Sequence, residues 1–505
     1  MDRGVTPAGG LLADRVAATP DRLAAIDAAS GERWTYADLD AEVETLAGRL
    51  ASLGIAAGDR VPLLFDTSVD AVHTVHAVRR LGAVPVPLDA ALASGELQRR
   101  IGVVSADWLV CPGDAAAAAV DAVEGTPVRP VTLAEREQLP SIPSYDPEPV
   151  PKVDRAPEET GLIMFTSGTT GPAKAVPLTR RNLRASAVAS AFRLGVDPGD
   201  RWLDPLPIHH MGGLAPVLRS ALYGTAVVIQ TGFDAERTAR ATREHGATGV
   251  SLVPTMLRRI VEADARLAES LRFVLLGGAA ADESLIDACE ERGVPVHPTY
   301  GATETASQIA TVTPGEAFEH PGTVGRPLHG TEVRITSEDG SERPPGEVGE
   351  IVVSGPTVTP GYLDGDDSAF GERGLRTGDL GYRDDVRRLY VVGRGDDVIV
   401  TGGENVPAGE VEDALREHPT VREAAVIGLD DPEWGERVAA LVVPADSAAD
   451  SVDADDLRAF CGERLAGFKT PKTIGIADAL PRTASGTVDR EAVRERLRDL
   501  RRERS

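Results

Sequence analysis

Helix-like and strand-like segments alternate over much of the first 300 residues, and this alternation most restricts the fold that the chain can adopt. Residues 35–53 have the spacing of an amphipathic helix, with Thr35 as the expected N-cap and Gly54 as the stop. Such alternation predicts βαβ units, and therefore an α/β protein with mainly parallel sheets. The expected elements that follow are a strand at 61–65, a helix at 71–81 and a strand at 83–88, and the pattern recurs at 161–230 and 247–300.

The length and the changes of pattern along the chain predict more than one domain. A chain of 505 residues exceeds what one compact core usually holds. From about residue 330 the pattern becomes one of short strands separated by Gly and Pro turns, and from residue 396 it becomes mixed helix and strand. We expect a large N-terminal domain of stacked, mainly parallel sheets over 1–395, with a β subdomain at about 330–395, and a small mobile α+β domain over 396–505.

The charge balance restricts the partners of the chain. Its formal net charge is −26, so the surface repels nucleic acid and anionic membranes, and we expect neither as a partner. An acidic, lysine-poor composition resembles that of proteins from salt-loving cells, where dissolved ions screen the self-repulsion. An ordinary acidic protein from a GC-rich genome is the alternative, and we favour the halophilic origin. The lysines are Lys152, Lys174, Lys469 and Lys472.

The cysteines and the N-terminus favour a cytoplasmic protein. Cys111, Cys289 and Cys461 have neither metal-ligand spacing nor the number that a disulfide framework needs. The first residues lack the basic, then apolar, then small-residue pattern of a signal peptide. No apolar run approaches the ~20 residues that span a bilayer, so we expect no membrane insertion.

A nonapeptide rich in glycine and hydroxyl groups is the sharpest local signal of chemistry. It follows an apolar strand at 162–165 and precedes a helix that begins near Thr179. Glycine lets the backbone approach an anion closely, hydroxyl and N–H groups donate to phosphate oxygens, and a lysine adds positive charge. The spacing is not that of a Walker A loop, and a plain Ser/Thr/Gly turn is the alternative. The expected phosphate-binding loop consists of Thr166, Ser167, Gly168, Thr169, Thr170, Gly171, Pro172, Ala173 and Lys174.

This nonapeptide resembles the phosphate loop of the adenylate-forming superfamily, which includes acyl-CoA synthetases, luciferases and peptide-synthetase adenylation domains. Further matches to that superfamily follow in order, between about residues 160 and 490. By this resemblance, Tyr300 stacks on the adenine of ATP, Thr303 bonds a phosphate and Glu304 holds Mg²⁺. The same resemblance places Gly301 in the nucleotide segment, and Gly278, Ala279 and Ala280 in a loop that flanks the nucleotide.

The matches nearer the C-terminus imply a ribose contact and a domain movement. Asp379 resembles the residue that binds both ribose hydroxyls, a role that suits a carboxylate because it can accept two hydrogen bonds from a cis-diol. By resemblance, Arg394 meets the ribose or the phosphates and Asp396 is the hinge. Residues 402–406 look like the loop that enters the site for thiol transfer.

The resemblance also implies the reaction and its co-substrates. A carboxylic acid would attack the α-phosphorus of ATP and expel pyrophosphate, with Mg²⁺, Lys174 and the loop N–H groups offsetting the charge on the phosphates. The small domain would then turn, and the thiol of CoA would displace AMP. We therefore expect Lys174, Glu304 and His210 to be the catalytic residues, with ATP, Mg²⁺ and CoA as cofactor and co-substrates.

Three stretches narrow the likeness to the o-succinylbenzoate–CoA ligases of menaquinone synthesis, namely residues 206–214, 218–224 and 299–309. Their substrate carries two carboxylates, of which the succinyl one is activated and the benzoate one must stay paired when buried. Arg219 is the expected partner because a guanidinium can grip a carboxylate with two hydrogen bonds. A salt bridge on a helix surface is an equal alternative for that arginine.

Other residues of these stretches have expected places in or near the acid pocket. His210 and Ser307 could line the pocket, whereas His209 is expected to be structural. The ligases usually carry serine where Gly212 stands, so one pocket hydroxyl is missing here.

One departure from the superfamily concerns the chemistry itself. The family has a lysine near the C-terminus that contacts the acyl and phosphate oxygens, and Thr487 stands in its place. A threonine cannot supply that positive charge, and loss of a charge-stabilising donor typically costs ~10²–10³ in rate. Lys469, Lys472 or Arg490 could substitute, adenylation could be slow, or this member could use a different mechanism.

Three rival functions remain open from the sequence. The first is another acyl- or aryl-CoA synthetase, whose pocket would be apolar if the acid were fatty. The second, a peptide-synthetase adenylation domain, is disfavoured because about fifteen residues follow the last motif. The third is a nucleotide-binding regulator that has lost catalysis, which Thr487 favours. Assembly into a homo-oligomer is also open.

Overall fold

The computed structural model describes residues 10–135, 139–166, 173–337, 339–365, 368–395, 398–401, 404–431, 434–445, 452–465, 467–483 and 487–503. The chain divides into two units. The first contains the described residues of the N-terminal part through Val333, together with Val353–Leu375. The second contains Arg334–Val352 and the described residues from Arg376 onward. The domain boundary expected between residues 395 and 396 stays a prediction.

A small parallel sheet with the strand order β4-β3-β5-β6 lies in the first unit. Helix α2 begins after Thr35 as predicted, because Thr35 Oγ1 accepts a hydrogen bond from the N–H of Asp38 and the Asp38 carboxylate accepts one from the N–H of Thr35. Helices α4 and α5 bury one face of the sheet, and α2 and α3 contribute to the core on the other face. The bounds are α1 Gly10–Ala18, α2 Tyr36–Ser52, β3 Arg60–Leu64, α3 Val69–Arg80, β4 Val84–Leu88, α4 Ser94–Val104, β5 Trp108–Cys111, α5 Ala116–Val123, β6 Arg129–Thr132 and a 3₁₀ turn at Ile142–Ser144.

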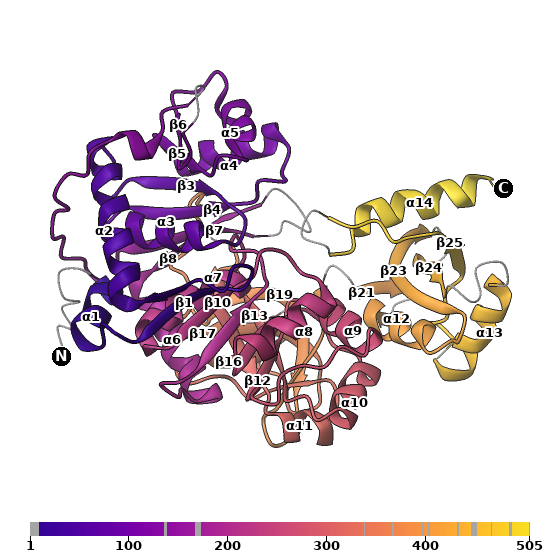
Figure 1. The fold of residues 1–505 in the computed structure, drawn as a ribbon. Coiled ribbons are helices and arrows are strands. Elements are labelled where there is room, and N and C mark those ends of the chain that lie inside the picture. The colour runs from indigo at the N-terminus through magenta and orange to yellow at the C-terminus, as the bar shows by residue number, and fades with distance from the viewer. Residues whose placement is uncertain are drawn as a thin grey trace. The chain divides into compact units, whose positions relative to one another are not determined.

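A larger sheet in the same unit has the order β14-β13-β12-β11-β9-β10-β1-β2. Its strands are parallel from β1 through β13, and the antiparallel strands β2 and β14 form its edges. Helices α8, α9 and α10 bury one face, and α7 contributes to the core on the other face (Figure 1). The bounds are β1 Leu23–Asp27, β2 Arg33–Thr35, β9 Arg201–Asp204, α7 Met211–Tyr223, β10 Ala226–Ile229, α8 Ala235–Glu244, β11 Gly249–Leu252, α9 Pro254–Glu262, β12 Phe273–Leu276, α10 Glu283–Glu291, β13 Val296–Ala302, β14 Ser307–Thr311, α11 Pro314–Glu319 and β15 Thr323–Gly325.

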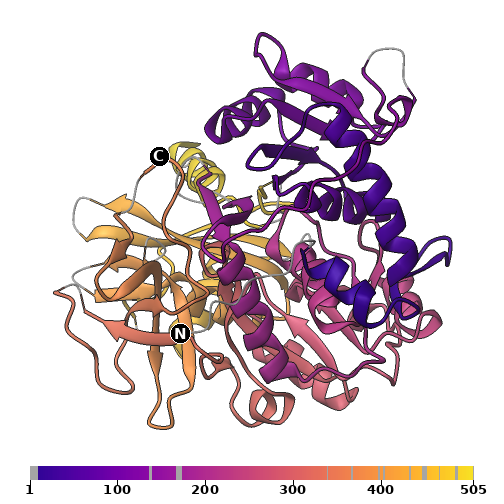
Figure 2. The same cartoon turned by 90° about the vertical axis from the view of Figure 1, so that its left-hand side faces the viewer.

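The two parallel sheets form separate layers of the first unit. In Figure 1 the indigo-to-purple elements of the small sheet lie together, apart from the rose-to-salmon helices α8 to α11, and Figure 2 shows the indigo-to-purple elements together from a second side. One apolar core contains both Leu63 of β3 and Val227 of β10, so the helices around it serve both sheets. The expected α/β class with stacked, mainly parallel sheets is therefore confirmed.

An antiparallel hairpin carries the predicted phosphate loop. Strand β7 (Thr160–Phe165) pairs with β8 (Ala175–Thr179), and helix α6 (Arg180–Leu194) begins directly after β8. The expected helix start near Thr179 is confirmed, since Thr179 caps α6 in a capping box with Asn182. The sequence pattern did not indicate β8, because Ala175–Thr179 is buried along its whole length and shows no alternation.

The second unit contains two groups of strands. Strands β20, β19, β17 and β16 pair in that order and match the short strands that the sequence predicts near 330–395. In the C-terminal group, α12 and α13 bury one face of β23 and β24, and α14 buries the other. The sequence pattern predicts that Val406-Pro407 opens a helix, but these residues end strand β22 and α12 begins at Ala408. The bounds are β16 Glu332–Thr336, β17 Gly349–Ser354, β19 Gly374–Arg383, β20 Leu389–Arg394, β21 Val398–Thr401, β22 Glu404–Pro407, α12 Ala408–Arg416, β23 Val421–Asp431, β24 Gly435–Pro444, α13 Ala454–Arg464, β25 Thr473–Ile476 and α14 Arg490–Glu503. The short strand β18, Phe370–Gly371, belongs to the first unit.

Two sequence expectations concern membranes and cysteines. In the part of the chain that the structure describes, no helix combines the length and the apolar character that crossing a membrane requires. Cys111, Cys289 and Cys461 are all buried and free.

Candidate active site

The carboxyl ends of the parallel strands bring several predicted site segments to one edge of the large sheet. The segment that contains His210 follows β9, the loop with Gly278, Ala279 and Ala280 follows β12, and Tyr300 lies near the end of β13. In open α/β sheets ligands bind at the carboxyl ends of the strands. The sheet order therefore places segments that are about 100 residues apart in sequence at the edge where a site is expected.

The two ends of the predicted phosphate loop are tied together by the β7–β8 hairpin. The N–H of Thr166 donates to the carbonyl of Lys174 at 3.0 Å, and the N–H of Lys174 donates to Thr166 Oγ1 at 3.0 Å. The loop is thus closed at its base by a matched pair of hydrogen bonds. The predicted residues Ser167, Gly168, Thr169, Thr170 and Gly171 lie outside the described residues.

Tyr362 connects two predicted catalytic residues. Its hydroxyl donates to Glu304 Oε1 at 2.8 Å, and the Lys174 ammonium lies 4.5 Å from the centre of its ring. The structure therefore places Glu304 at the hydroxyl of Tyr362 and Lys174 over its ring. The sequence analysis missed Tyr362, because it lies 58 residues after Glu304 and no local pattern marks it.

The turn that carries Glu304 is tightly constrained. Strands β13 and β14 pair antiparallel around it, with Ala302 opposite Ser307 and Gly301 opposite Gln308. A Cβ atom at position 301 would overlap the carbonyl of Ser307, so only glycine fits there. Ser307 has φ +118°, in a region that non-glycine residues rarely adopt. Backbone strain of this kind concentrates at functional sites and fixes the direction of the neighbouring side chains.

The predicted adenine segment has the exposure that a nucleotide contact needs. Gly278, Ala279 and Ala280 are exposed, and Gly278 has a positive φ of +83° that turns the chain directly after β12. Tyr300 and Thr303 are half-buried, so each presents part of its side chain to solvent.

The predicted ribose and phosphate residues of the second unit lie side by side. Asp379 on β19 stands opposite Arg394 on β20, and Arg394 Nε lies 3.2 Å from Asp379 Oδ1. The Asp379 carboxylate is mostly buried while the Arg394 side chain is exposed. The predicted hinge residue Asp396 lies outside the described residues.

His209 and His210 lie in the turn between β9 and α7. Their rings are 4.6 Å apart, and His209 Nε2 lies 3.7 Å from Asp89 Oδ2. Burial, with a smaller contribution from His210, lowers the pKa of His209 to about 4, although Asp89 opposes the shift. Burial also lowers the pKa of His210. Both rings are therefore neutral near pH 7 and can act as hydrogen-bonding groups rather than as cations.

Arg219 is buried in the layer between helices α6 and α7 and strand β14. Its side chain is only 3% exposed, so the surface salt bridge considered as an alternative is not what the structure shows. Arg219 Nη1 donates to Gln308 Oε1 at 2.9 Å, and Nη2 donates to Ser186 Oγ at 3.1 Å. Ser186 Oγ in turn donates to the carbonyl of Ala306 at 2.7 Å. The guanidinium thus braces the residues on both sides of Ser307.

The charge of Arg219 is not balanced by a carboxylate of the described residues. Its side-chain partners are the oxygens of Gln308 and Ser186, with the ring of Trp202 at 6.0 Å. Burial lowers the pKa of Arg219 because the charged form loses its hydration. A buried cation without a counter-ion favours the approach of an anion.

Gly212 is explained by the packing of the same turn. A Cβ atom at position 212 would lie 2.9 Å from Leu206 Cδ1, so any larger residue would require Leu206 to move. Leu206 belongs to the turn that carries the two histidines. The packing of this turn therefore favours glycine at position 212.

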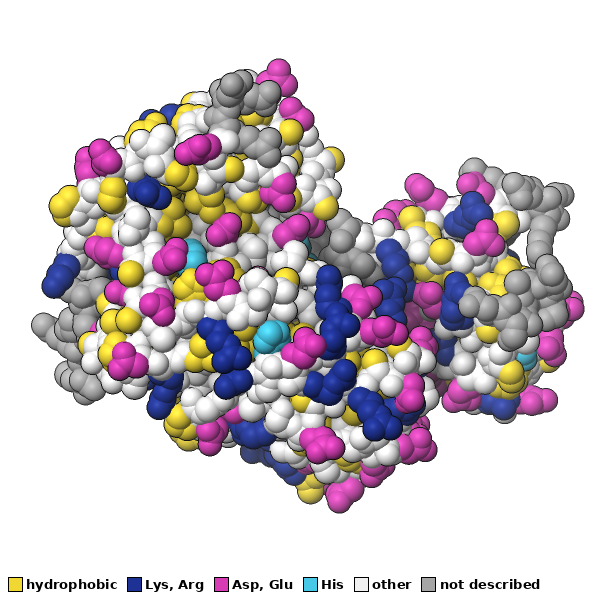
Figure 3. Space-filling model, in the orientation of Figure 1, with side chains coloured by type: hydrophobic (Ala, Val, Ile, Leu, Met, Phe, Trp, Pro, Cys, Tyr) yellow, Lys and Arg dark blue, Asp and Glu magenta, His cyan; other side chains and the backbone are white. Residues whose placement is uncertain are grey.

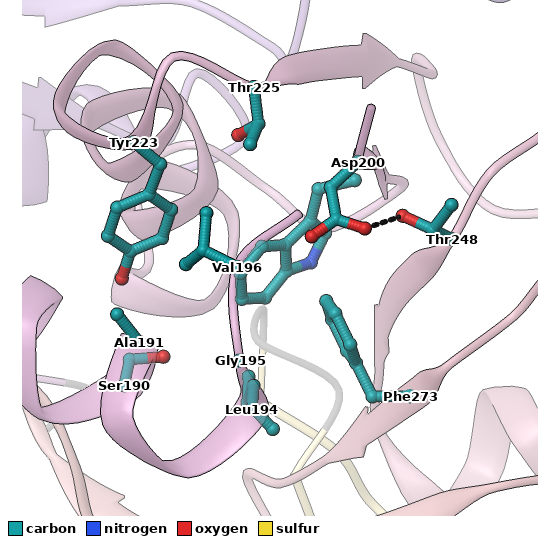
Figure 4. A pocket seen from close by; sticks show the side chains of 11 residues that line it. Ser190, Ala191, Leu194, Gly195, Val196, Asp200, Tyr223, Thr225, Thr248 and Phe273 are labelled. Carbon is teal, nitrogen blue, oxygen red and sulfur yellow. Dashed lines mark hydrogen bonds between the residues drawn. The ribbon is translucent and has the colours of Figure 1, made fainter. Parts of the chain in front are cut away.

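A pocket in the first unit is lined by residues other than those of the predicted site. Trp202, Phe273, Tyr223, Asp200 and Thr248 help to line it, and Thr248 Oγ1 donates to Asp200 Oδ1 at 2.8 Å (Figure 4). Tyr223 ends α7, and the other four lie at or just before the amino ends of β9, β11 and β12, at the edge opposite to the predicted site. None of the predicted site residues lines this pocket.

The described residues contain no complete metal cage. No group of three or more His, Cys, Asp and Glu side chains among them could hold a metal ion. Mg²⁺ usually binds through one or two carboxylates, substrate phosphates and water. Glu304, which Tyr362 holds in place, therefore fits an ion that arrives with ATP.

The residues considered as substitutes for the missing lysine all have partners of their own. Lys469 Nζ contacts both Glu410 carboxylate oxygens at 2.6 and 2.7 Å, and Lys472 Nζ lies 3.8 Å from the centre of the Trp434 ring. Arg490 Nη1 donates to the carbonyl of Val426 at 2.6 Å. Thr487 itself shares a 2.7 Å hydrogen bond with the hydroxyl of Thr483.

Comparison with known proteins gives one consistent result. The chain matches the AMP-binding enzyme family over residues 12–363 and the AMP-binding enzyme C-terminal domain over residues 410–487. A 2-succinylbenzoate–CoA ligase of Bacillus licheniformis is 40% identical over 482 residues, which cover 95% of this chain and 98% of that protein.

Two solved structures of o-succinylbenzoate–CoA synthetase from Bacillus subtilis are also similar. The complex with the acyl-adenylate intermediate has a TM-score of 0.89 at 35% identity, covering 96% of this chain and 98% of that one. The complex with ATP and magnesium ion has a TM-score of 0.89 at 34% identity, covering 97% and 99%.

Proposed function

The chain belongs to the family of AMP-binding enzymes, and we propose that it joins 2-succinylbenzoate to coenzyme A in a reaction driven by ATP. It is an AMP-forming acid–thiol ligase with ATP, Mg²⁺ and CoA as cofactor and co-substrates. The observation that carries the proposal is its similarity to 2-succinylbenzoate–CoA ligases along nearly the whole chain. The reaction is a step of menaquinone biosynthesis, as the sequence analysis expects.

The reaction proceeds in two half-reactions. First, an oxygen of the succinyl carboxylate bonds to the α-phosphorus of ATP, the bond from that phosphorus to the bridging oxygen breaks, and pyrophosphate leaves. Then the sulfur of CoA bonds to the acyl carbon, the bond from that carbon to the AMP oxygen breaks, and the thiol proton passes to solvent. The products are 2-succinylbenzoyl-CoA, AMP and pyrophosphate.

Residues of the first unit bind the phosphates. Thr166 and Lys174 close the base of the phosphate loop, and the Lys174 ammonium attracts the phosphate oxygens. Glu304 supplies the protein carboxylate for Mg²⁺. When bound, Mg²⁺ offsets the negative charge on the triphosphate.

The predicted nucleoside contacts are proposed residue by residue. Tyr300 offers a ring face to the adenine, and the exposed turn at Gly278 lets the chain approach it closely. Asp379 accepts hydrogen bonds from the ribose hydroxyls, and Arg394, which already contacts that carboxylate, holds its orientation. Asp396 remains the proposed hinge, and residues 395 and 396 the proposed domain boundary.

The acid pocket recognises a second carboxylate. Arg219 supplies its positive potential, and Ser307, whose neighbours Arg219 braces, supplies a hydroxyl. His210 supplies a neutral ring, because burial lowers its pKa. A fatty acid would leave the Arg219 charge unbalanced, which favours the dianionic substrate over another acyl- or aryl-CoA synthetase activity.

A surface of the second unit fits the nucleotide end of CoA. Trp434 is 42% exposed, and Lys472 Nζ lies 3.8 Å from the centre of its ring. An adenine needs a flat ring to stack on and its phosphates need cations. One of the four lysines of a strongly acidic chain lies here, so we propose that this surface, the Trp434–Lys472 surface, binds CoA.

The setting of the enzyme is also proposed. The free, buried cysteines and the absence of a membrane-spanning helix among the described residues support a cytoplasmic enzyme whose partners are small molecules. The net charge of −26 supports a salt-rich cytoplasm and argues against binding to nucleic acid. A homo-oligomer is compatible with this function but not required by it.

The second candidate is a nucleotide-binding protein without catalysis. The observation that favours it is Thr487, together with the existing partners of Lys469, Lys472 and Arg490. The two candidates share ATP binding and differ in the first half-reaction.

Exchange of labelled pyrophosphate into ATP separates the candidates. With 2-succinylbenzoate, ATP and Mg²⁺ in high salt, we expect exchange that depends on the acid. The Thr487→Lys variant should exchange faster, by up to ~10²-fold, because it restores a charge-stabilising donor. ATP binding without exchange for wild type, with any acid tested, would favour the non-catalytic candidate.

A further inference from the structure

One segment of the first unit, Pro356–Leu363, joins the phosphate-loop hairpin to the turn that carries Glu304. The Asn182 side chain at the start of α6 donates to the carbonyls of Pro356 and Val358 at 2.9 and 2.8 Å. The N–H of Thr359 donates to the carbonyl of Glu304 at 2.8 Å, and its hydroxyl donates to the carbonyl of Pro177 at 2.6 Å. We call this segment the strap.

The strap ends at the residues that face the predicted chemistry. The N–H of Leu363 donates to the carbonyl of Ala175 at 3.0 Å, which fixes the strap beside β8. Tyr362 precedes it and packs edge-on against Phe370, with ring centres 5.3 Å apart. The Tyr362 ring is thus held from the backbone and from a neighbouring ring, and its hydroxyl reaches Glu304 while its face meets Lys174.

We propose that Tyr362 is a positioning residue that sets the Glu304 carboxylate for Mg²⁺ and the Lys174 ammonium for the triphosphate at the same time. The inference rests on the proposed function, because it assumes that ATP and Mg²⁺ bind at these residues. Nothing in the local sequence around Tyr362 indicates this role.

Two physical effects carry the proposal. The hydroxyl hydrogen bond to one carboxylate oxygen restricts the rotation of the Glu304 side chain, so the other oxygen is held in a fixed direction for the metal ion. The electron-rich face of the ring attracts the ammonium without neutralising it, so Lys174 keeps its charge for the phosphates. The hydrogen bonds of the strap fix the position of the Tyr362 ring, so both effects act at the same time.

The two effects can be separated by substitution. Tyr362→Phe removes the hydroxyl and keeps the ring, whereas Tyr362→Leu removes both. Tyr145→Phe is the matched control, because it removes the hydroxyl of a half-buried tyrosine in the same unit, outside the site. Circular dichroism and the midpoint of thermal unfolding show whether each variant is folded.

The test is equilibrium binding of ATP, measured by calorimetry over a series of Mg²⁺ concentrations. For Tyr362→Phe we expect the Mg²⁺ concentration that gives half of the full effect on ATP affinity to rise about tenfold, with ATP affinity in the absence of Mg²⁺ close to wild type. For Tyr362→Leu we also expect weaker Mg²⁺-free binding, by about 2–5-fold. Tyr145→Phe should match wild type.

A double-mutant cycle shows whether Tyr362 acts through Glu304. In a Glu304→Gln background, Tyr362→Phe should have no further effect on the Mg²⁺ dependence. The proposal is overturned if Tyr362→Phe stays within twofold of wild type, or if its effect persists undiminished in the Glu304→Gln background. Wild-type protein that binds no ATP at any Mg²⁺ concentration would overturn the proposed function and this inference together.

Discussion

Asp204, at the carboxyl end of β9, is a buried carboxyl group with few hydrogen-bond partners among the described residues. Asp204 is fully buried, and its Oδ1 accepts only a long hydrogen bond from the N–H of Leu206 at 3.4 Å. Its Oδ2 has no partner in the described part of the chain. Burial raises the pKa of Asp204 well above its usual range. The folded protein therefore keeps the proton on this carboxyl to a higher pH than the unfolded chain does.

The raised pKa of Asp204 predicts how the stability of the folded protein changes with pH. As pH rises above ~3.9, the unfolded chain releases the proton first, so Asp204 favours unfolding increasingly until the folded-state pKa is passed. We expect Asp204→Asn, which stays neutral, to raise the midpoint of thermal unfolding at pH 7 by about 2–4 °C. The gain should shrink as pH falls towards 4.

The exposed residue Asp21 provides the control for this effect. Asp21→Asn also replaces a carboxyl group by an amide, but at an exposed position, so it should leave the midpoint of thermal unfolding nearly unchanged at both pH values. Equal gains for the two variants, or a gain for Asp204→Asn that does not depend on pH, would show that net charge and not burial is responsible.

Arg219 gives a second prediction at the residue scale. Because its buried charge lies beside Ser307 and lacks a protein carboxylate among the described residues, Arg219→Gln should raise the KM for 2-succinylbenzoate by at least about tenfold. The KM for ATP should stay within twofold, which steady-state kinetics with each substrate varied in turn would measure. Arg240→Gln, on the exposed side of α8, is the control. An equal rise of both KM values would point to a general loss of folding instead.

At the scale of elements, the sequence predicts most of the regular structure of the large sheets. Residues 35–53, 61–65 and 83–88 match α2, β3 and β4 within two residues, because a cap, a glycine stop and short apolar runs mark their ends. Strand β8 was not found because it is uniformly buried, and β22 was not found because Pro407 reads as a helix start.

The candidate site was predictable only where it is local in sequence. Thr166, Lys174, Glu304 and Asp379 could be proposed from the sequence because each lies within a short motif, and their roles stay predictions. Tyr362 and the bracing pair Ser186 and Gln308 were not, because their roles depend on contacts between segments that are distant in the chain. Only the folded structure shows which distant residues hold a motif in place.

The hairpin of β23 and β24 gives the prediction for this scale. Trp434 lies in the turn between these strands. Its backbone N–H donates to Asp431 Oδ1 at 3.1 Å, and the next residue, Gly435, has φ +78°. We expect Trp434→Ala to raise the KM for CoA about tenfold, because base–aromatic stacking is worth ~1–3 kcal/mol. Pyrophosphate exchange should stay within twofold of wild type, because it does not need CoA.

An exposed aromatic residue of the other unit controls for the loss of a large side chain. Phe192 is 73% exposed on α6, and Phe192→Ala should change neither the KM for CoA nor the exchange rate. A KM for CoA that stays at the wild-type value in Trp434→Ala would refute the proposed role of the Trp434–Lys472 surface.

At the scale of the whole molecule, charge is the dominant property. The net charge is −26, and on the face shown in Figure 3 acidic side chains are spread widely among fewer basic ones. Like charges on the folded surface repel one another over roughly the Debye length, which falls from ~10 Å at 0.1 M salt to ~3 Å at 1 M. The folded chain should therefore gain stability from dissolved salt.

This gain is measurable by thermal unfolding in KCl. Between 0.1 and 1 M KCl (about the range over which screening becomes complete), we expect the midpoint to rise by at least about 2–4 °C. Sucrose at the same osmolality controls for effects of the solvent that do not involve charge. A midpoint that is flat or falls with KCl, or that rises equally in sucrose, would contradict the halophilic interpretation.

The most direct test of the central claim is to identify the thioester that the protein makes. The protein is incubated in high salt with ATP, Mg²⁺, CoA and, in separate reactions, 2-succinylbenzoate, benzoate and a medium-chain fatty acid, and the products are identified by mass spectrometry. The account predicts 2-succinylbenzoyl-CoA and AMP in equal amounts, with little thioester from the other acids. Thioesters of benzoate or the fatty acid without the succinylbenzoyl one would contradict it.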